Sequence, residues 1–312
     1  MALPRLPTVL LLLALVAGLS GTAGATKPTG PLQAPLPSWH LEDTWVYNVS
    51  ASITIRDVEV SGRGVMTRTV AAHDAANGTW TIRNVSEVRG GGSYRGVPVS
   101  GILYDNTTVV LSASDLGWLS RDTLRTANYL VFGAVVKEQA TTNITWAEPM
   151  GGYRFPFTVG MTWNGSTREN FTYQRQPDGA PYNWRGTAAW YTTVETQETL
   201  EVEGQQYETL RLRVDDEAED TDNTYWLRWW APHVGNHVKE QRLVEGETQV
   251  TATLLKYRYG ANVLGLPRLI PDGEAEPQPE APRTGVPAPG LIPLAGALGA
   301  AAALLAARRR TR

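Results

Sequence analysis

The fold of this 312-residue chain is decided by residues 44–56, which read TWVYNVSASITIR. Apolar and polar side chains alternate along this stretch, and Val46 is the exception. Trp45 and Tyr47 fall on one face, and Asn48 falls on the other. A period of two is typical of a β-strand with one buried face. The stretch therefore predicts a half-buried strand with Asn48 in solvent.

The same alternation recurs at 79–83, 210–214 and 250–254. Turn signals separate these runs, because glycine and asparagine adopt the backbone angles of tight turns. The turn signals are Asn77-Gly78, Gly90-Gly91-Gly92, Asn164-Gly165 and Asp178-Gly179. We therefore expect residues 39–260 to be mainly β, folded as a curved antiparallel sheet.

One stretch favours a helix within this β-rich region. Ser114-Asp115 can cap a segment in which leucines recur. These leucines are Leu116, Leu119, Leu124 and Leu130. The expected architecture is a sheet curved around one short helix. A duplicated pair of smaller β-domains is the alternative, because 43–45 and 161–163 open the two halves with similar residues.

Charge and cysteine content exclude several classes of protein. Residues 1–25 and 291–312 hold five of the 28 basic residues and none of the 31 acidic ones, which leaves 23 basic against 31 acidic residues between them. An acidic body argues against nucleic-acid binding. The chain has no cysteine, which excludes disulfides, thiolate metal sites and a cysteine nucleophile.

The N-terminal residues 1–25 have the layout of a secretory signal peptide. Arg5 precedes an apolar run at 8–19, and Ala23-Gly24-Ala25 offers a small-residue cleavage site after Ala25. Such a run reaches only about 18 Å as a helix, short of the bilayer core of about 30 Å. We expect signal peptidase to remove this helix, leaving a spacer at 26–38 before the β-rich ectodomain.

Seven Asn-x-Ser/Thr sequons mark candidate glycosylation sites of an exported chain. They begin at Asn48, Asn77, Asn84, Asn106, Asn143, Asn164 and Asn170. This frequency exceeds what the Ser and Thr content alone would produce. The sequence predicts N-glycosylation, and therefore an oligosaccharyltransferase as a partner.

The C-terminal part has three sections. Residues 261–290 are rich in proline and acidic side chains, which predicts an extended linker. Residues 291–307 carry no charge, and the arginine-rich end 308–312 follows. An apolar run closed by arginines predicts a membrane helix with a basic cytoplasmic end. The ectodomain is then tethered at the cell surface.

Pro289-Gly290-Leu291, the short apolar helix and the arginines resemble the PGF-CTERM sorting tags of archaeal surface proteins. Leu291 stands where that family has phenylalanine. The resemblance implies an archaeal envelope, and an archaeosortase that removes the helix and attaches a lipid. A permanent transmembrane helix is the alternative.

A second resemblance covers the later half. Residues 155–163 read FPFTVGMTW, and 224–240 read TYWLRWWAPHVGNHVKE. Both stretches resemble uncharacterised exported β-proteins that are similar to lipoprotein-carrier half-barrels. The resemblance implies a half-barrel wrapped around an apolar cavity, without catalytic residues.

An aromatic hairpin is the candidate ligand site. It contains Tyr225, Trp226, Arg228, Trp229 and Trp230. Alternation divides it into a stripe of Trp226, Arg228 and Trp230 and an opposite stripe that includes Tyr225 and Trp229. These rings either pack in the core or form a platform for sugars or lipid.

Metal and cofactor sites have little support in the sequence. His233 and His237 are four apart, but Pro232 and Gly235 exclude the helix that would bring them together. The acidic run 215–222 lacks EF-hand spacing, so a solvated loop is favoured over a calcium site. We expect no metal and no cofactor.

The expected function is a non-catalytic binding or structural module, membrane-tethered and extracellular, that can accommodate an apolar ligand. An exported hydrolase on the same β scaffold is the alternative. No nucleophile elbow, zinc-protease motif or phosphate loop is present.

Overall fold

The computed structural model describes residues 30–55, 58–94, 97–131, 133–176, 179–216, 224–260 and 262–264. The signal peptide, linker, membrane helix and sorting motif that the sequence predicts lie outside these residues. The compact unit that begins at Leu32 is described below. No helix among the described residues is long and apolar enough to cross a membrane.

Thirteen antiparallel strands form one sheet. They are β1 (Thr44–Ile55), β2 (Val58–Asp74), β3 (Thr79–Tyr94), β4 (Val97–Ser112), β5 (Trp118–Val131), β6 (Ala134–Met150), β7 (Thr162–Gln176), β8 (Tyr182–Val202), β9 (Gln205–Asp216), β10 (Thr224–Ala231), β11 (Asn236–Val244), β12 (Glu247–Tyr259) and β13 (Asn262–Leu264). Each strand pairs with the next along the chain, so the order in the sheet is the order in the sequence.

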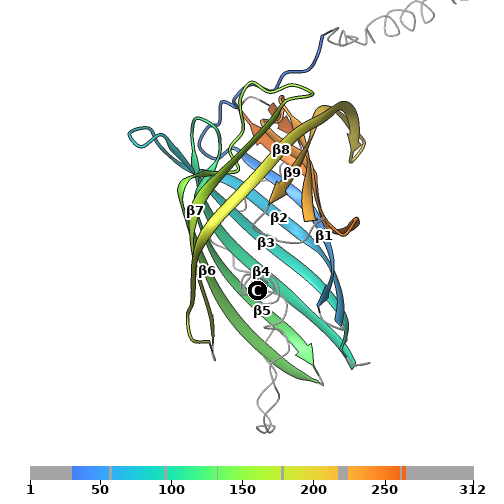
Figure 1. Cartoon of the computed structure of the whole chain (residues 1–312). Helices are drawn as coiled ribbons and strands as arrows, with labels where there is room; N and C mark the ends of the chain where they lie inside the picture. The colour runs from blue at the N-terminus through green and yellow to red at the C-terminus, as the bar shows by residue number, and fades with distance from the viewer. Residues whose placement is uncertain are drawn as a thin grey trace, which may run out of the picture. The chain divides into compact units, whose positions relative to one another are not determined.

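The sheet closes into a twelve-stranded barrel because β1 also pairs with β12. This pairing runs from Thr44 opposite Arg258 to Ala51 opposite Val250. The tilted strands wrap in one layer around a common axis (Figure 1). The half-barrel expectation is corrected to a closed barrel, and a single sheet replaces the alternative of two β-domains.

Strand alternation gave the correct inner face of β1. Trp45 and Tyr47 are fully buried inside the barrel, and Asn48 is exposed. Leu212 on β9 and Leu254 on β12 are also buried, as their alternation predicts. Burial of apolar area lowers the free energy of the folded state by about 25 cal/mol per Å². A shift of one residue would turn these side chains to the outer face and lose that energy, so the register is fixed.

The predicted short helix is wrong. Its residues form the turn before β5 and the strand itself, and the described residues contain no helix. Leu124 and Leu130 lie on the outer face of β5, 39% and 44% exposed. The leucine spacing suggested a helix, but the alternation from Arg121 to Tyr129 sets the inner face of a strand.

Two of the predicted turns are also wrong. Gly90-Gly91-Gly92 lies within β3, and Asn164-Gly165 lies within β7. Gly165 is needed because the ring of Trp190 on β8 covers its Cα, where a methyl group would collide. Glycine in a strand interior permits such close approach and sharp curvature. Asn77-Gly78 forms the turn between β2 and β3 as predicted.

One end of the barrel is packed with apolar side chains, and we call it the packed end. The segments 32–43 and 151–161 pack into this end and form a two-residue bridge between Ala34 and Phe157. Trp39 and Trp45 donate from Nε1 to the backbone oxygens of the β10–β11 turn, each at 2.9 Å. These bonds satisfy the buried indoles and fix the turn.

Replacing Gly64 by alanine should destabilise the barrel, because the added methyl group would overlap the carbonyl oxygen of Glu87 on β3. Overpacking of this kind costs about 1–3 kcal/mol, so we expect a loss of that size in the free energy of unfolding by urea. Gly30→Ala is the matched control, because nothing lies within 4 Å of the added methyl group. Equal midpoints for both variants would contradict the close approach of β2 and β3.

Candidate functional site

The aromatic hairpin of β10 and β11 lies in the barrel wall. Trp226 is opposite Arg242 and Arg228 is opposite Glu240, and this face points into the barrel. Trp230 on the same face is buried at 1% exposure among the rings of Tyr153 and Phe157. The sequence predicts this stripe without deciding which way it faces. The structure turns it inward, and Trp230 belongs to the core.

The opposite face of the hairpin is also occupied. Trp229 is buried, donates from Nε1 to Oε1 of Glu198 at 2.8 Å, and lies under the ammonium of Lys239. Tyr225 lies under the guanidinium of Arg213, 4.0 Å from the ring centre. Trp229 and Trp230 therefore do not form an exposed platform, which favours the packing alternative for both.

A buried group of polar side chains lies beside Trp230, and we call it the polar cluster. Its members come from β1, β2, β10, β11 and the segments next to them. They are Tyr47, Arg68, Tyr153, Arg228, Asn236, His237 and Glu240. The sequence indicated Tyr47 as part of a buried strand face, Arg228 as a candidate ligand residue and His237 as one of two separated histidines, but it did not bring the three together. The inward parity of β2 could have indicated Arg68.

Glu240 is at the centre of the polar cluster. Its Oε1 lies 2.9 Å from Nδ1 of His237 and accepts from Arg68 Nη1 at 3.3 Å. The same Nη1 donates to Oδ1 of Asn236 at 3.1 Å. Burial alone would raise the pKa of Glu240, but Arg68, His237 and Arg228 lower it strongly. The carboxylate is therefore an anion held by cations.

Tyr153 continues this chain of contacts. Its hydroxyl lies 3.2 Å from Nε2 of His237 and accepts from Arg228 Nη1 at 3.2 Å. Burial lowers the pKa of His237 to about 4, against the attraction of Glu240, so the imidazole is neutral near pH 7. A carboxylate, a neutral imidazole and a hydroxyl in series can pass a proton in principle. Here Tyr153 and His237 are 7% and 5% exposed, which leaves no room for a substrate.

The sequence argued against a metal site shared by His233 and His237, and these two side chains lie in different surroundings. His233 is exposed and stacks on Tyr207, with ring centres 5.5 Å apart, whereas His237 lies in the polar cluster. Among the residues described, no three histidine or acidic side chains gather as a metal site. Residues 217–222 of the acidic run lie outside the described residues.

Beyond the packed end, the inner face of the barrel carries charged and aromatic side chains, and we call this space the lumen. Arg125 on β5 donates to both carboxylate oxygens of Asp105 on β4, at 2.7 Å each. Arg175 on β7 pairs with Glu138 on β6. Phe171 points inward on β7, and it is half-buried rather than buried.

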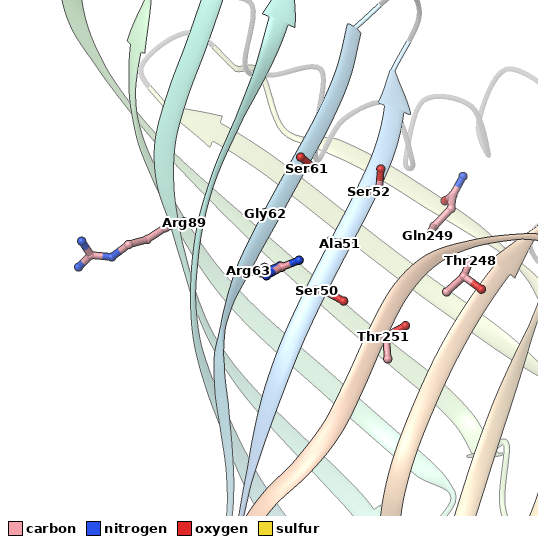
Figure 2. Close-up of a pocket in the computed structure, with 10 residues that line it drawn as sticks. All are labelled: Ser50, Ala51, Ser52, Ser61, Gly62, Arg63, Arg89, Thr248, Gln249 and Thr251. Atoms are coloured by element: carbon pink, nitrogen blue, oxygen red, sulfur yellow. The ribbon is translucent and has the colours of Figure 1, made fainter. Parts of the chain in front are cut away.

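A hollow of about 530 Å³ lies where the pairing of β1 with β12 ends. It is lined mainly by small polar side chains (Figure 2). The lining residues are Ser50, Ala51, Ser52, Ser61, Gly62, Arg63, Arg89, Thr248, Gln249 and Thr251. In Figure 2, Arg89 extends away from the others. Such small side chains offer little apolar area to a ligand.

The sequon asparagines fall on two different sides of the barrel wall. Six of them are exposed on the outer face or in a turn: Asn48, Asn77, Asn106, Asn143, Asn164 and Asn170. Asn84 points inward from β3, and its Oδ1 accepts from Nε of Arg68 at 3.3 Å. The structure therefore separates Asn84 from the other six.

Comparisons with known proteins do not assign this chain to a family. No protein-family model matches the chain, and no curated protein matches it. A crystal structure of a beta-barrel-like protein of domain of unknown function DUF1849 from Brucella abortus is similar, at 9% identity and a TM-score of 0.40. The match covers 71% of this chain and 99% of that one. A likeness this weak carries no conclusion about function.

Acid should destabilise the barrel through His237. Its pKa is about 4 in the folded chain, against an ordinary value of 6.5 for an unfolded one, so only the unfolded chain binds this proton as the pH falls through that window. The stability that the neutral imidazole contributes is complete above pH 6.5 and is lost toward pH 4. Between about pH 7 and pH 5, the wild type should lose about 2 kcal/mol more than His237→Gln in urea unfolding. Parallel pH profiles would contradict a neutral His237.

Glycans should occupy the exposed sequons and spare Asn84, because a transferase cannot reach a side chain inside the barrel. Peptide mass spectrometry of the chain from a glycosylating archaeal host should find unmodified Asn84 beside modified Asn48 and Asn170. Asn48→Gln should remove one glycan from the intact mass, and Asn84→Gln should remove none. A glycan on Asn84 would place β3 in a different register.

Proposed function

We propose that this chain is a non-catalytic binding module of an archaeal cell envelope. It is exported, N-glycosylated and tethered to the membrane with the barrel outside, and its lumen takes an apolar ligand. The signal-peptide layout of 1–25 and the apolar, arginine-ended segment 291–312 support export and tethering. Signal peptidase, archaeosortase and oligosaccharyltransferase are the processing partners that this proposal implies.

The polarity of the outer wall supports a barrel that is surrounded by water. Exposed threonine, serine, asparagine and charged side chains alternate along the outer face of the strands, as on β7 from Thr162 to Gln176. The exposed sequons are spread over β1, the β2–β3 turn, β4, β6 and β7. Glycans on these strands would cover much of the wall. A ligand therefore has better access to the inside of the barrel than to its wall.

One observation carries the binding proposal: aromatic side chains face the lumen without being buried. Phe171 and Tyr173 on β7, and Trp184 and Trp190 on β8, all face inward and are half-buried. Rings at the packed end, such as Phe157 and Trp230, are almost completely buried. Inward rings that stay partly accessible are typical of a site that a ligand completes.

The charges in the lumen favour binding over hydrolysis. General acid–base work needs a carboxyl group free to exchange protons with the substrate. Asp105, Glu138 and Glu240 are each engaged by an arginine, and Glu169 accepts from Nε1 of Trp146 at 3.0 Å. The exported hydrolase remains the alternative, and the polar cluster is too buried to favour it.

Native mass spectrometry of the full chain from an archaeal host, with lipid extraction of the same sample, tests this proposal. We expect a co-purifying acyl or isoprenoid species that is lost on unfolding. Phe171→Ala together with Trp184→Ala should lower its occupancy, whereas Tyr191→Ala on the outer face should not. A protein that carries only glycans, with no lipid in the extract, would contradict the binding module.

A further inference from the structure

Arg121 on β5 is a charged side chain on the inner face of the barrel. Its lateral neighbours are Val109 on β4 and Ile144 on β6. Val109 is buried in the apolar core, and Ile144 packs against a second, smaller apolar group around Trp146. Arg121 therefore lies between two apolar surfaces, and it is half-buried.

The guanidinium of Arg121 has few partners. Its Nε donates to Oγ1 of Thr123 at 3.3 Å. No carboxylate of the described residues forms an ion pair with it. Asp105 acts on it electrostatically, but Asp105 is already held by Nε and Nη2 of Arg125. The terminal nitrogens of Arg121 are thus left to solvent or to a ligand.

Arg121 stands outside the ion pairs around it. Arg125 pairs with Asp105 and Arg175 pairs with Glu138, while Glu169 on β7 accepts from Nε1 of Trp146 at 3.0 Å. Burial, and then the repulsion of Arg125, lowers the pKa of Arg121. A cation held in apolar surroundings without a counter-charge is costly, and a bound anion removes that cost.

The surroundings of Arg121 suit an anion with an apolar tail. Two buried hydroxyls, those of Thr107 and Thr123, lie 3.1 Å apart on the same inner face. On the other side, Ile144 is opposite the half-buried ring of Phe171. These hydroxyls hydrogen-bond each other, so one of the two O–H groups remains to donate elsewhere. A head group at Arg121 would meet the guanidinium beside that hydroxyl, and a chain attached to it would lie against the aromatic lumen.

We propose that the lumen binds an anionic amphiphile, whose carboxylate or phosphate oxygens pair with Arg121 and whose apolar chain packs against Ile144 and Phe171. This inference rests on the proposed binding function and names the chemistry of its ligand. A planar guanidinium binds two oxygens of such a head group at once.

The test measures binding of dodecanoate, dodecyl phosphate, dodecanol and inorganic phosphate to the full chain in neutral detergent, by native mass spectrometry. Both anionic amphiphiles should bind more tightly than dodecanol, and inorganic phosphate should bind weakly. Arg121→Gln should weaken the anionic amphiphiles about tenfold or more and leave dodecanol unchanged. Arg121→Lys should restore part of the loss. Arg83→Gln, which removes an exposed arginine from the outer face of β3, is the matched control.

The outcomes separate this inference from the proposed function. If dodecanol binds as well as the anions, or if Arg121→Gln changes nothing, the lumen binds apolar chains but Arg121 is not its anion site. Inorganic phosphate binding as tightly as dodecyl phosphate would overturn the amphiphile and leave a site for free anions. If none of the probes binds, the binding module itself fails. Circular dichroism of Arg121→Gln shows whether the barrel is intact in each case.

Discussion

The pairing of β1 with β12 is the constraint on which the rest of this structure depends. It joins strands from opposite ends of the described chain, from Thr44 with Arg258 to Ala51 with Val250. Closure removes two open edges that would otherwise pair with other chains. It also turns one face of every strand inward, so that each inward side chain must pack, find a partner or meet a ligand.

The polar cluster fastens this closure from the inside. The hydroxyl of Tyr47 on β1 donates to the backbone oxygen of His237 on β11, at 3.0 Å. Arg68 on β2 reaches Glu240 on β11. These bonds cross β12, so they hold strands on both sides of the closing pair in one register. Removing one partner would leave a buried charge unmatched, which costs more than the pair contributes.

The sequence predicted the strands better than the way they assemble. Alternation identified the inner faces at Trp45, Leu212 and Leu254, because a period of two is a local property of the chain. Closure depends on a contact between distant strands, and no local pattern records it. Two glycine-containing stretches were wrongly predicted to be turns, and the reason is physical. A residue without a side chain permits a turn, and it equally permits the ring of Trp190 to cover Gly165. The polar cluster was missed because its members are scattered along the sequence.

Parity along each strand decides what a residue can do in this barrel. Asn48 and Asn84 share the same sequon, yet one is exposed and the other accepts from Arg68 inside the wall. Arginines divide in the same way: Arg83 faces outward, whereas Arg121 faces the lumen. Outward polar groups make the outer face of the barrel compatible with water, as they do on any exposed strand. Inward polar groups have apolar neighbours, and the low dielectric constant there strengthens the interaction of a single charge with a ligand. We therefore expect the residues that determine ligand specificity to lie on the inner face of the barrel.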